Sequence, residues 1–86
     1  MPEVYTKDDY LTADKYAKKY GLTKEIVERA IKISRVRKAS IIIARGGVKR
    51  EITVSMHGRY HIRPEPAAHE ALNKIIQEMQ SKGESK

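Results

Sequence analysis

Hydrophobic positions in the first half of the chain follow the period of an α-helix in two consecutive segments. In each segment the apolar residues are spaced one, three or four positions apart, and they are Ala13, Tyr16, Ala17, Tyr20, Ile26, Val27, Ala30 and Ile31. Such a set lies on one face of a helix with about 3.6 residues per turn. Thr12 and Thr23 precede the two segments, where a threonine hydroxyl can accept a hydrogen bond from an unpaired amide of the first turn. The pattern therefore predicts two capped helices.

A single glycine joins these two predicted helices. Gly21 can adopt the left-handed conformation that ends one helix and lets the next begin at a steep angle. With a small residue at Ala17, this glycine and an aliphatic residue at Val27, residues 13–32 resemble the helix-turn-helix family. The resemblance implies that the second helix is a recognition helix that enters the major groove of DNA. An ordinary αα-hairpin that only builds a core has the same pattern, and both interpretations remain open.

The resemblance also implies a set of contact residues on the exposed face of the second helix. These candidates are Thr23, Lys24, Glu25, Glu28, Arg29 and Lys32. We expect base discrimination from Lys24, Glu25, Glu28 and Arg29. Because phosphate repels a carboxylate, we expect the two glutamates mainly to orient Arg29 and Lys32 along the helix, although glutamate can also accept from N4 of cytosine.

From residue 41 the apolar pattern changes to that of β-strands. Three consecutive isoleucines, residues 41–43, are typical of a buried strand, and Gly46–Gly47 predicts a two-residue hairpin turn. Alternating residues 48–56 predict the return strand, and Gly58 marks a second turn before a short third strand. We therefore expect a β-hairpin or a three-stranded antiparallel sheet, with the first hairpin tip projecting beyond the core.

A third helix is predicted near the end of the chain. Pro66 can occupy the first helical turn, where its missing amide is not needed. The apolar stripe that follows is Ala68, Leu72, Ile75, Ile76 and Met79. We expect this helix to continue to about residue 80, and residues 81–86 to form a disordered tail without an apolar anchor. The expected fold is therefore α+β, with one domain over residues 1–80.

Composition limits the possible classes of protein. The chain has 86 residues and no cysteine, so disulfides and thiolate metal sites are excluded, and a reducing cytosol suits the sequence. No apolar run approaches the roughly 20 residues of a membrane span, and the first ten residues are too polar for a signal peptide. We expect a soluble protein of the cytoplasm with no membrane partner.

Charge favours a polyanionic partner. There are 18 basic and 11 acidic side chains, which give a formal charge of +7. Residues 29–50 contain no acid. Residues 34–40 are predicted as a basic connector with Val36 turned inward and with Arg35, Arg37 and Lys38 near phosphate. A basic run is also often just a solvated face, and that interpretation stays open.

The order of two helices, a basic glycine-tipped hairpin and a helix is that of a winged helix-turn-helix module. Its wing would consist of Arg45, Gly46, Gly47, Lys49 and Arg50. In such a module the wing lies over phosphates or in the adjoining minor groove, where arginine suits the negative potential. A plain hairpin that needs glycine for its geometry is the alternative.

Residues 10–32 read YLTADKYAKKYGLTKEIVERAIK and are followed by the predicted glycine-tipped hairpin. On this pattern, residues 10–62 resemble the small excisionase-like DNA-binding proteins of temperate phages and mobile elements, including the Cox and Apl type. The resemblance implies that the cytoplasm is that of a bacterial host. This resemblance implies a protein that binds repeated sites on double-stranded DNA cooperatively, bends the DNA and directs an integrase toward excision. It also implies repression of nearby promoters. The implied partners are double-stranded DNA, further copies of the chain and an integrase. MerR-type repressors share the opening pattern, and the third helix is longer than the excisionase pattern requires.

No pattern indicates catalysis, a cofactor, a small-molecule ligand or a metal. His57 and His61 could be neighbours near the second turn, but without a cysteine and without a helical frame around them we do not expect a zinc site. The glycines do not form a phosphate-binding loop. Two other functions remain alternatives. RNA binding would favour aromatic stacking on an exposed sheet, which offers only Tyr60. A protein-interaction module, such as an anti-repressor or assembly factor, would use an exposed Leu72, Ile76 and Met79 face on the last helix.

Overall fold

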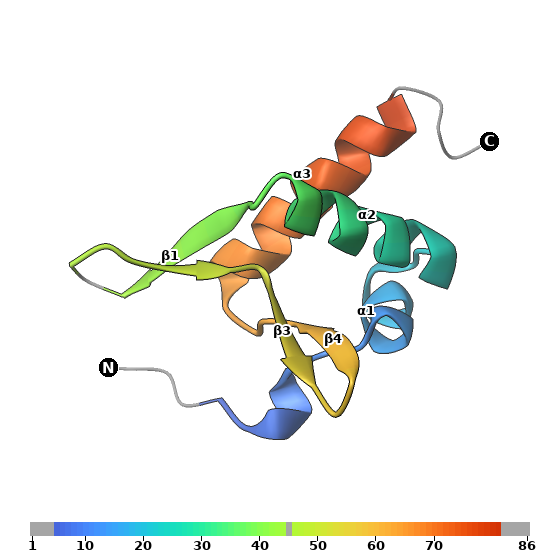
Figure 1. Cartoon of the computed structure of the whole chain (residues 1–86). Coiled ribbons are helices and arrows are strands. Elements are labelled where there is room, and N and C mark those ends of the chain that lie inside the picture. The colour runs from blue at the N-terminus through green and yellow to red at the C-terminus, as the bar shows by residue number, and fades with distance from the viewer. Residues whose placement is uncertain (1–4, 45, 82–86) are drawn as a thin grey trace.

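The structure, a computed structural model, describes residues 5–44 and 46–81. Its elements in chain order are η1 (Lys7–Asp9), α1 (Ala13–Tyr20), α2 (Lys24–Val36), β1 (Ser40–Ala44), β2 (Val48–Glu51), β3 (Thr53–Met56), β4 (Arg59–Ile62) and α3 (Pro66–Ser81). The predicted α+β class is confirmed, and so is the order of two helices, strands and a helix (Figure 1). The disordered tail predicted from residue 81 is wrong at Ser81, which is the last residue of α3, and the rest of that tail, residues 82–86, lies outside the described residues.

Local capping explains where α1 and α2 begin and where α1 ends. The hydroxyl of Thr12 accepts from the Lys15 amide at 3.4 Å, and that of Thr23 accepts from the Ile26 amide at 3.3 Å. Gly21 has φ 66° and ψ 35°, the left-handed conformation that a side chain would disfavour. The two caps and the glycine turn are therefore confirmed.

The three helices enclose the core together with the inner ends of the strands. α3 packs against α2 and β1, and α1 packs against α2 and β4. In Figure 1 α3 crosses behind α2. The predicted stripe of α3 is buried along its whole length, and its residues are Ala68, Leu72, Ile75, Ile76 and Met79.

Polar contacts lock α1 onto α3 inside this core. The hydroxyl of buried Tyr16 donates to Oδ1 of Asn73 at 2.6 Å, and the hydroxyl of Tyr20 lies 2.6 Å from Nδ1 of His69. Burial lowers the pKa of His69 and Lys19 lowers it further, whereas the Arg63 backbone and Glu65 act in the opposite direction. His69 is therefore held mainly in its neutral form.

Within the described residues, the strands form two separate hairpins rather than one three-stranded sheet. β1 pairs with β2 and β3 pairs with β4, both antiparallel. The single return strand predicted for residues 48–56 is wrong, because the chain bends at Ile52. Ile52 and Thr53 are both buried, whereas regular alternation would turn only one of two neighbours inward. The Ile52 carbonyl also accepts from the Arg63 amide at 3.0 Å, which fixes the bend.

The β1–β2 hairpin projects away from the helices, as predicted for its tip (Figure 1). The prediction of a buried isoleucine run is wrong at its middle residue: Ile41 is buried and Ile43 is partly buried against the core, but Ile42 is 60% exposed. Both Gly46 and Gly47 have positive φ, as the turn prediction required. The connection is nevertheless three residues long, since Ala44 pairs with Val48 after a register shift in β1.

The tight two-residue turn occurs instead in the second hairpin. His57 and Gly58, with φ of 52° and 74°, connect the paired ends of β3 and β4. Positive φ at both central residues is what a type I′ turn requires. On its other side β4 meets the start of the chain, where Leu11 and Ile62 exchange backbone hydrogen bonds of 3.2 and 2.7 Å. The second hairpin is thus tied to the base of α1.

Candidate nucleic-acid interface

One face of α2 is buried and the opposite face is exposed. The buried residues are Val27, Ala30, Ile31 and Ser34. The six residues predicted for a recognition helix are all exposed, and they are Thr23, Lys24, Glu25, Glu28, Arg29 and Lys32. The structure therefore places the whole predicted set on the solvent side of a helix that is anchored by its other face.

The basic connector predicted for residues 34–40 is partly wrong, because α2 continues to Val36. Arg35 lies in the last helical turn, and Val36 is 75% exposed instead of turned inward. Two residues beyond the end of the helix, Lys38 has a left-handed φ of 55°, and the Ala39 amide donates to the Ser34 carbonyl at 2.9 Å. All of the basic side chains in this segment are nevertheless exposed.

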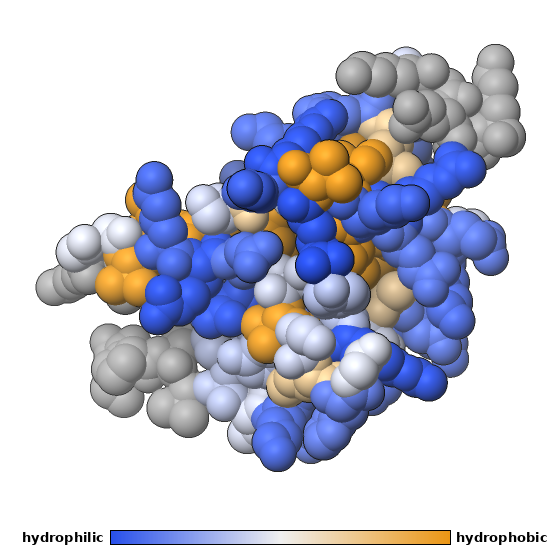
Figure 2. Space-filling view, in the orientation of Figure 1, coloured by the Kyte–Doolittle hydropathy of each residue, from blue (hydrophilic) through white to orange (hydrophobic). Residues whose placement is uncertain are grey.

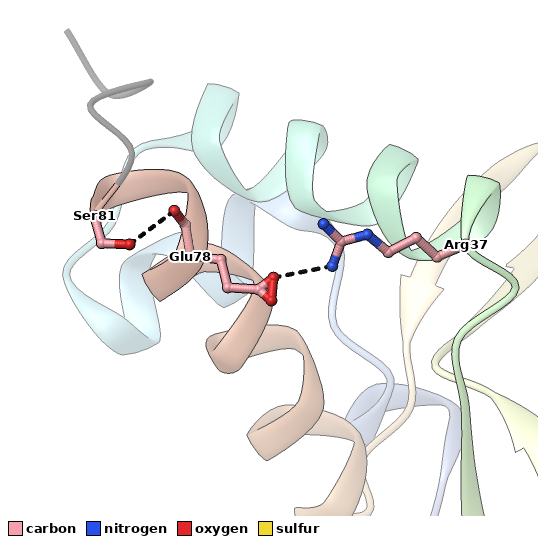
Figure 3. A network of polar contacts seen from close by, with 3 residues as sticks. All are labelled: Arg37, Glu78 and Ser81. Carbon is pink, nitrogen blue, oxygen red and sulfur yellow. Dashed lines mark hydrogen bonds and ion pairs between the residues drawn. The ribbon is translucent and has the colours of Figure 1, made fainter.

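Arg37 turns toward α3. Its guanidinium donates to the Glu78 carboxylate at 3.0 Å, and the Ser81 hydroxyl donates to the Glu78 carbonyl at 3.1 Å (Figure 3). Both side chains of the ion pair are about half exposed, so solvent screens it and its contribution to stability is at most about 1 kcal/mol. Such a weak pair can open when a phosphate competes for the arginine.

A groove of about 640 Å³ separates α2 from β4, with the first turn of α1 at its edge. Residues four apart on α2 share this side of the helix. The groove has four basic side chains and two acidic ones, and these are Lys24, Lys32, Arg35, Arg59, Asp14 and Glu28. Two more cations than carboxylates therefore line it.

Tyr60 and Arg35 meet across this groove. The guanidinium carbon of Arg35 lies 4.0 Å from the centroid of the Tyr60 ring, a cation–π contact. Tyr60 is 41% exposed and lies on the same face of β4 as buried Ile62. Its ring thus continues the buried face of the hairpin outward to the end of α2.

Arg59 lines the groove although no sequence pattern predicted it as a contact residue. It lies beyond the acid-free run of residues 29–50, which drew attention to the first hairpin. A signal was present in the sequence, because Arg59 directly follows the turn glycine Gly58, just as Lys49 and Arg50 lie two and three positions after Gly47 in the first hairpin. What the sequence did not reveal was that α2 and β4 lie on two sides of one groove.

The predicted wing residues lie on the projecting β1–β2 hairpin. Gly46, Gly47, Lys49 and Arg50 are exposed, and Arg45 lies outside the described residues. The Arg50 guanidinium donates to the Lys49 carbonyl at 3.0 Å. In Figure 2 hydrophilic residues cover most of the visible face, and hydrophobic residues appear there as separate patches. This hairpin and α2 are therefore two exposed basic elements of one small protein.

Comparisons with protein-family models, with curated proteins and with solved structures found no match. Among residues 5–44 and 46–81, acidic and histidine side chains form no group of three that could hold a metal ion. No helix in the same part of the chain is long and apolar enough to cross a membrane. The site is therefore interpreted from its own geometry and charge.

Proposed function

We propose that this protein binds double-stranded DNA sequence-specifically as a winged helix-turn-helix module. In this proposal α2 enters the major groove and the β1–β2 hairpin acts as the wing. The observation that carries the proposal is the exposed polar face of α2, which follows a glycine turn and is backed by a fully buried face. An α-helix with its side chains is about as wide as the major groove of B-DNA, so an exposed helix of this kind fits there.

Phosphate contacts would supply most of the affinity. The exposed basic residues of α2 and the first hairpin that fit this role are Lys32, Arg35, Lys38, Lys49 and Arg50. If each neutralises one phosphate, the logarithm of affinity falls with the logarithm of salt concentration with a slope of about −4.5. Base discrimination falls to Glu25, Glu28 and Arg29, together with Lys24.

The biological role that we propose is that of a phage or mobile-element excisionase, a transcriptional repressor, or both. Support comes from the sequence resemblance over residues 10–62 and from the small α+β fold with an exposed basic hairpin. In this role several copies bind neighbouring sites cooperatively and bend the DNA. Gel mobility of a bound fragment with the site placed at its centre or near its end measures the bend.

The alternative, a protein-interaction module built on the last helix, needs an exposed apolar face on α3. Leu72, Ile76 and Met79 are at most 4% exposed. A partner could not reach them unless α3 left the core.

The test separates sequence discrimination from general affinity. Binding sites are first selected from random duplexes, and affinities are then measured on the selected and on a random duplex. We expect Arg29→Ala to lose affinity mainly for the selected site, and Lys49→Ala to lose affinity equally for both, because base contacts specify and phosphate contacts do not. Lys74→Ala, which removes one exposed charge from α3, is the matched control. Wild-type protein that selects no sequence, or variants that behave like the control, would refute the proposal.

A further inference from the structure

The groove between α2 and β4 is lined along one wall by the predicted recognition helix. From Lys24 to Arg35 this wall is about 16 Å long at 1.5 Å per residue, so it can follow more than one phosphate of a strand at 3.4 Å rise per nucleotide. The opposite wall is the second hairpin, with Arg59 and Tyr60. Positive charge therefore faces the same channel from two elements that are far apart in the sequence.

The protein groove between α2 and β4 would lie beside a DNA backbone if α2 entered the major groove of DNA. A helix with its side chains is about 10–12 Å wide and the major groove is about 12 Å wide. A helix that fills the major groove of DNA has a sugar–phosphate backbone along each of its sides. The groove beside α2 lies on such a flank, and β4 forms its outer wall.

The Tyr60 and Arg35 pair suits a backbone ligand. Tyrosine hydroxyls and arginine guanidiniums are both common donors to DNA phosphate oxygens. The 4.0 Å contact holds the guanidinium against the Tyr60 ring before any ligand arrives. Because Arg35 is already ordered, less side-chain entropy is lost on binding.

We propose that this groove holds the backbone of one DNA strand, and that the β3–β4 hairpin is a second wing that acts beside the β1–β2 hairpin. The proposal rests on the DNA-binding function proposed above and adds the partner of the groove. Arg59 contacts phosphate directly. Tyr60 contacts the backbone and positions Arg35.

The first experiment measures the salt dependence of duplex binding by Arg59→Ala, with Lys74→Ala as the control for one lost charge. The loss of one phosphate contact makes the slope of log affinity against log salt concentration less steep by about 0.9. If the variant and the wild type bind equally at 1 M salt, the variant therefore binds roughly eightfold more weakly at 0.1 M salt. The control is expected to keep the wild-type slope. Circular dichroism checks that both variants are folded.

A second experiment places a reporter in the groove. The chain contains no tryptophan, so Tyr60→Trp introduces a single one whose emission reports directly on the groove. Adding duplex at low salt is expected to change this emission, and raising the salt is expected to reverse the change. Val36→Trp, at an exposed position that does not line the groove, is the matched control and is expected to change less.

The outcomes distinguish this inference from the proposed function. If the wild type binds duplex and Arg29→Ala loses discrimination, but Arg59→Ala keeps the full slope and the emission of the Tyr60→Trp variant stays constant, the second wing is wrong and the helix-turn-helix function stands. If the Tyr60→Trp variant responds equally to free inorganic phosphate, the groove is a simple anion site and the proposal is also wrong. If the wild type does not bind duplex at all, both proposals fail together.

Discussion

Replacing Lys38 with glycine is expected to stabilise the protein and to weaken the DNA binding that we propose. Lys38 lies just beyond the last turn of α2 with φ 55°, and Gly21 directly follows α1 with φ 66°. At both ends the amide of the next residue donates to a carbonyl five residues earlier, at 2.9 Å for Ala39 and 2.8 Å for Leu22. The same backbone motif thus carries glycine at one helix end and lysine at the other.

The expected magnitude follows from the backbone. The left-handed conformation costs a residue with a side chain about 1–2 kcal/mol. Glycine makes the unfolded chain more flexible, which removes about 0.4–1 kcal/mol of that gain. Lys38→Gly should therefore stabilise by roughly 1 kcal/mol, which raises Tm by about 4–8 °C in a domain of this size. Loss of one phosphate contact should lower duplex affinity roughly eightfold at 0.1 M salt, by the slope used above.

Thermal denaturation by circular dichroism and duplex titration measure the two effects on the same samples. Lys38→Ala removes the charge but keeps the backbone strain, so its affinity should fall equally while its Tm stays near the wild type. Gly21→Ala is the reverse control and should lower Tm. A Cβ there meets no described atom within 4 Å, so its penalty is conformational. If Lys38→Gly has a Tm no higher than that of Lys38→Ala, the argument from backbone strain is wrong. If both variants bind duplex as tightly as the wild type, Lys38 does not contact DNA.

Two further predictions concern the contacts between α1 and α3. Tyr16→Phe removes a hydroxyl that donates to Asn73 at 2.6 Å, and should destabilise the protein by about 1–2 kcal/mol in urea denaturation with an unchanged m-value; a loss below about 0.5 kcal/mol would contradict this. Folding lowers the pKa of His69 below its ordinary 6.5, so the unfolded chain binds the proton more strongly. The stability contributed by neutral His69 should be complete above about pH 7 and be lost as the pH falls through 6.5 toward the folded pKa. His69→Gln should flatten this part of the stability profile and His61→Gln should not, and equal profiles for both variants would show that His69 is not responsible.

Local sequence determined most of the helical part of the fold. The caps at Thr12 and Thr23, the turn at Gly21 and the stripe of α3 are specified by residues close to one another in the chain. Periodicity also separated the buried and exposed faces of α2, and so it identified the exposed residues that we propose as DNA contacts. It did not predict the end of α2, because Lys38 adopts a left-handed conformation that a sequence pattern normally assigns to glycine.

The bounds and register of the strands depend more on tertiary packing than those of the helices do. Alternation from residue 48 to 56 is regular, but Ile52 and Thr53 both turn inward because the chain passes there from one hairpin to the other. The backbone of Arg63 fixes that bend from eleven residues away. Strand register and bulges are settled by such long-range contacts, which the local pattern does not contain.

The amino-acid sequence alone therefore determined the helices, their caps, the basic charge and the exposed face of α2, since each depends on neighbours within a few positions. The tertiary structure alone decided that β4 lies beside α2, that Arg35 meets Tyr60, and that Arg59 joins the groove. Arg35 and Tyr60 are separated by two turns and a whole hairpin. Only packing of both hairpins against the helical core brings such residues together.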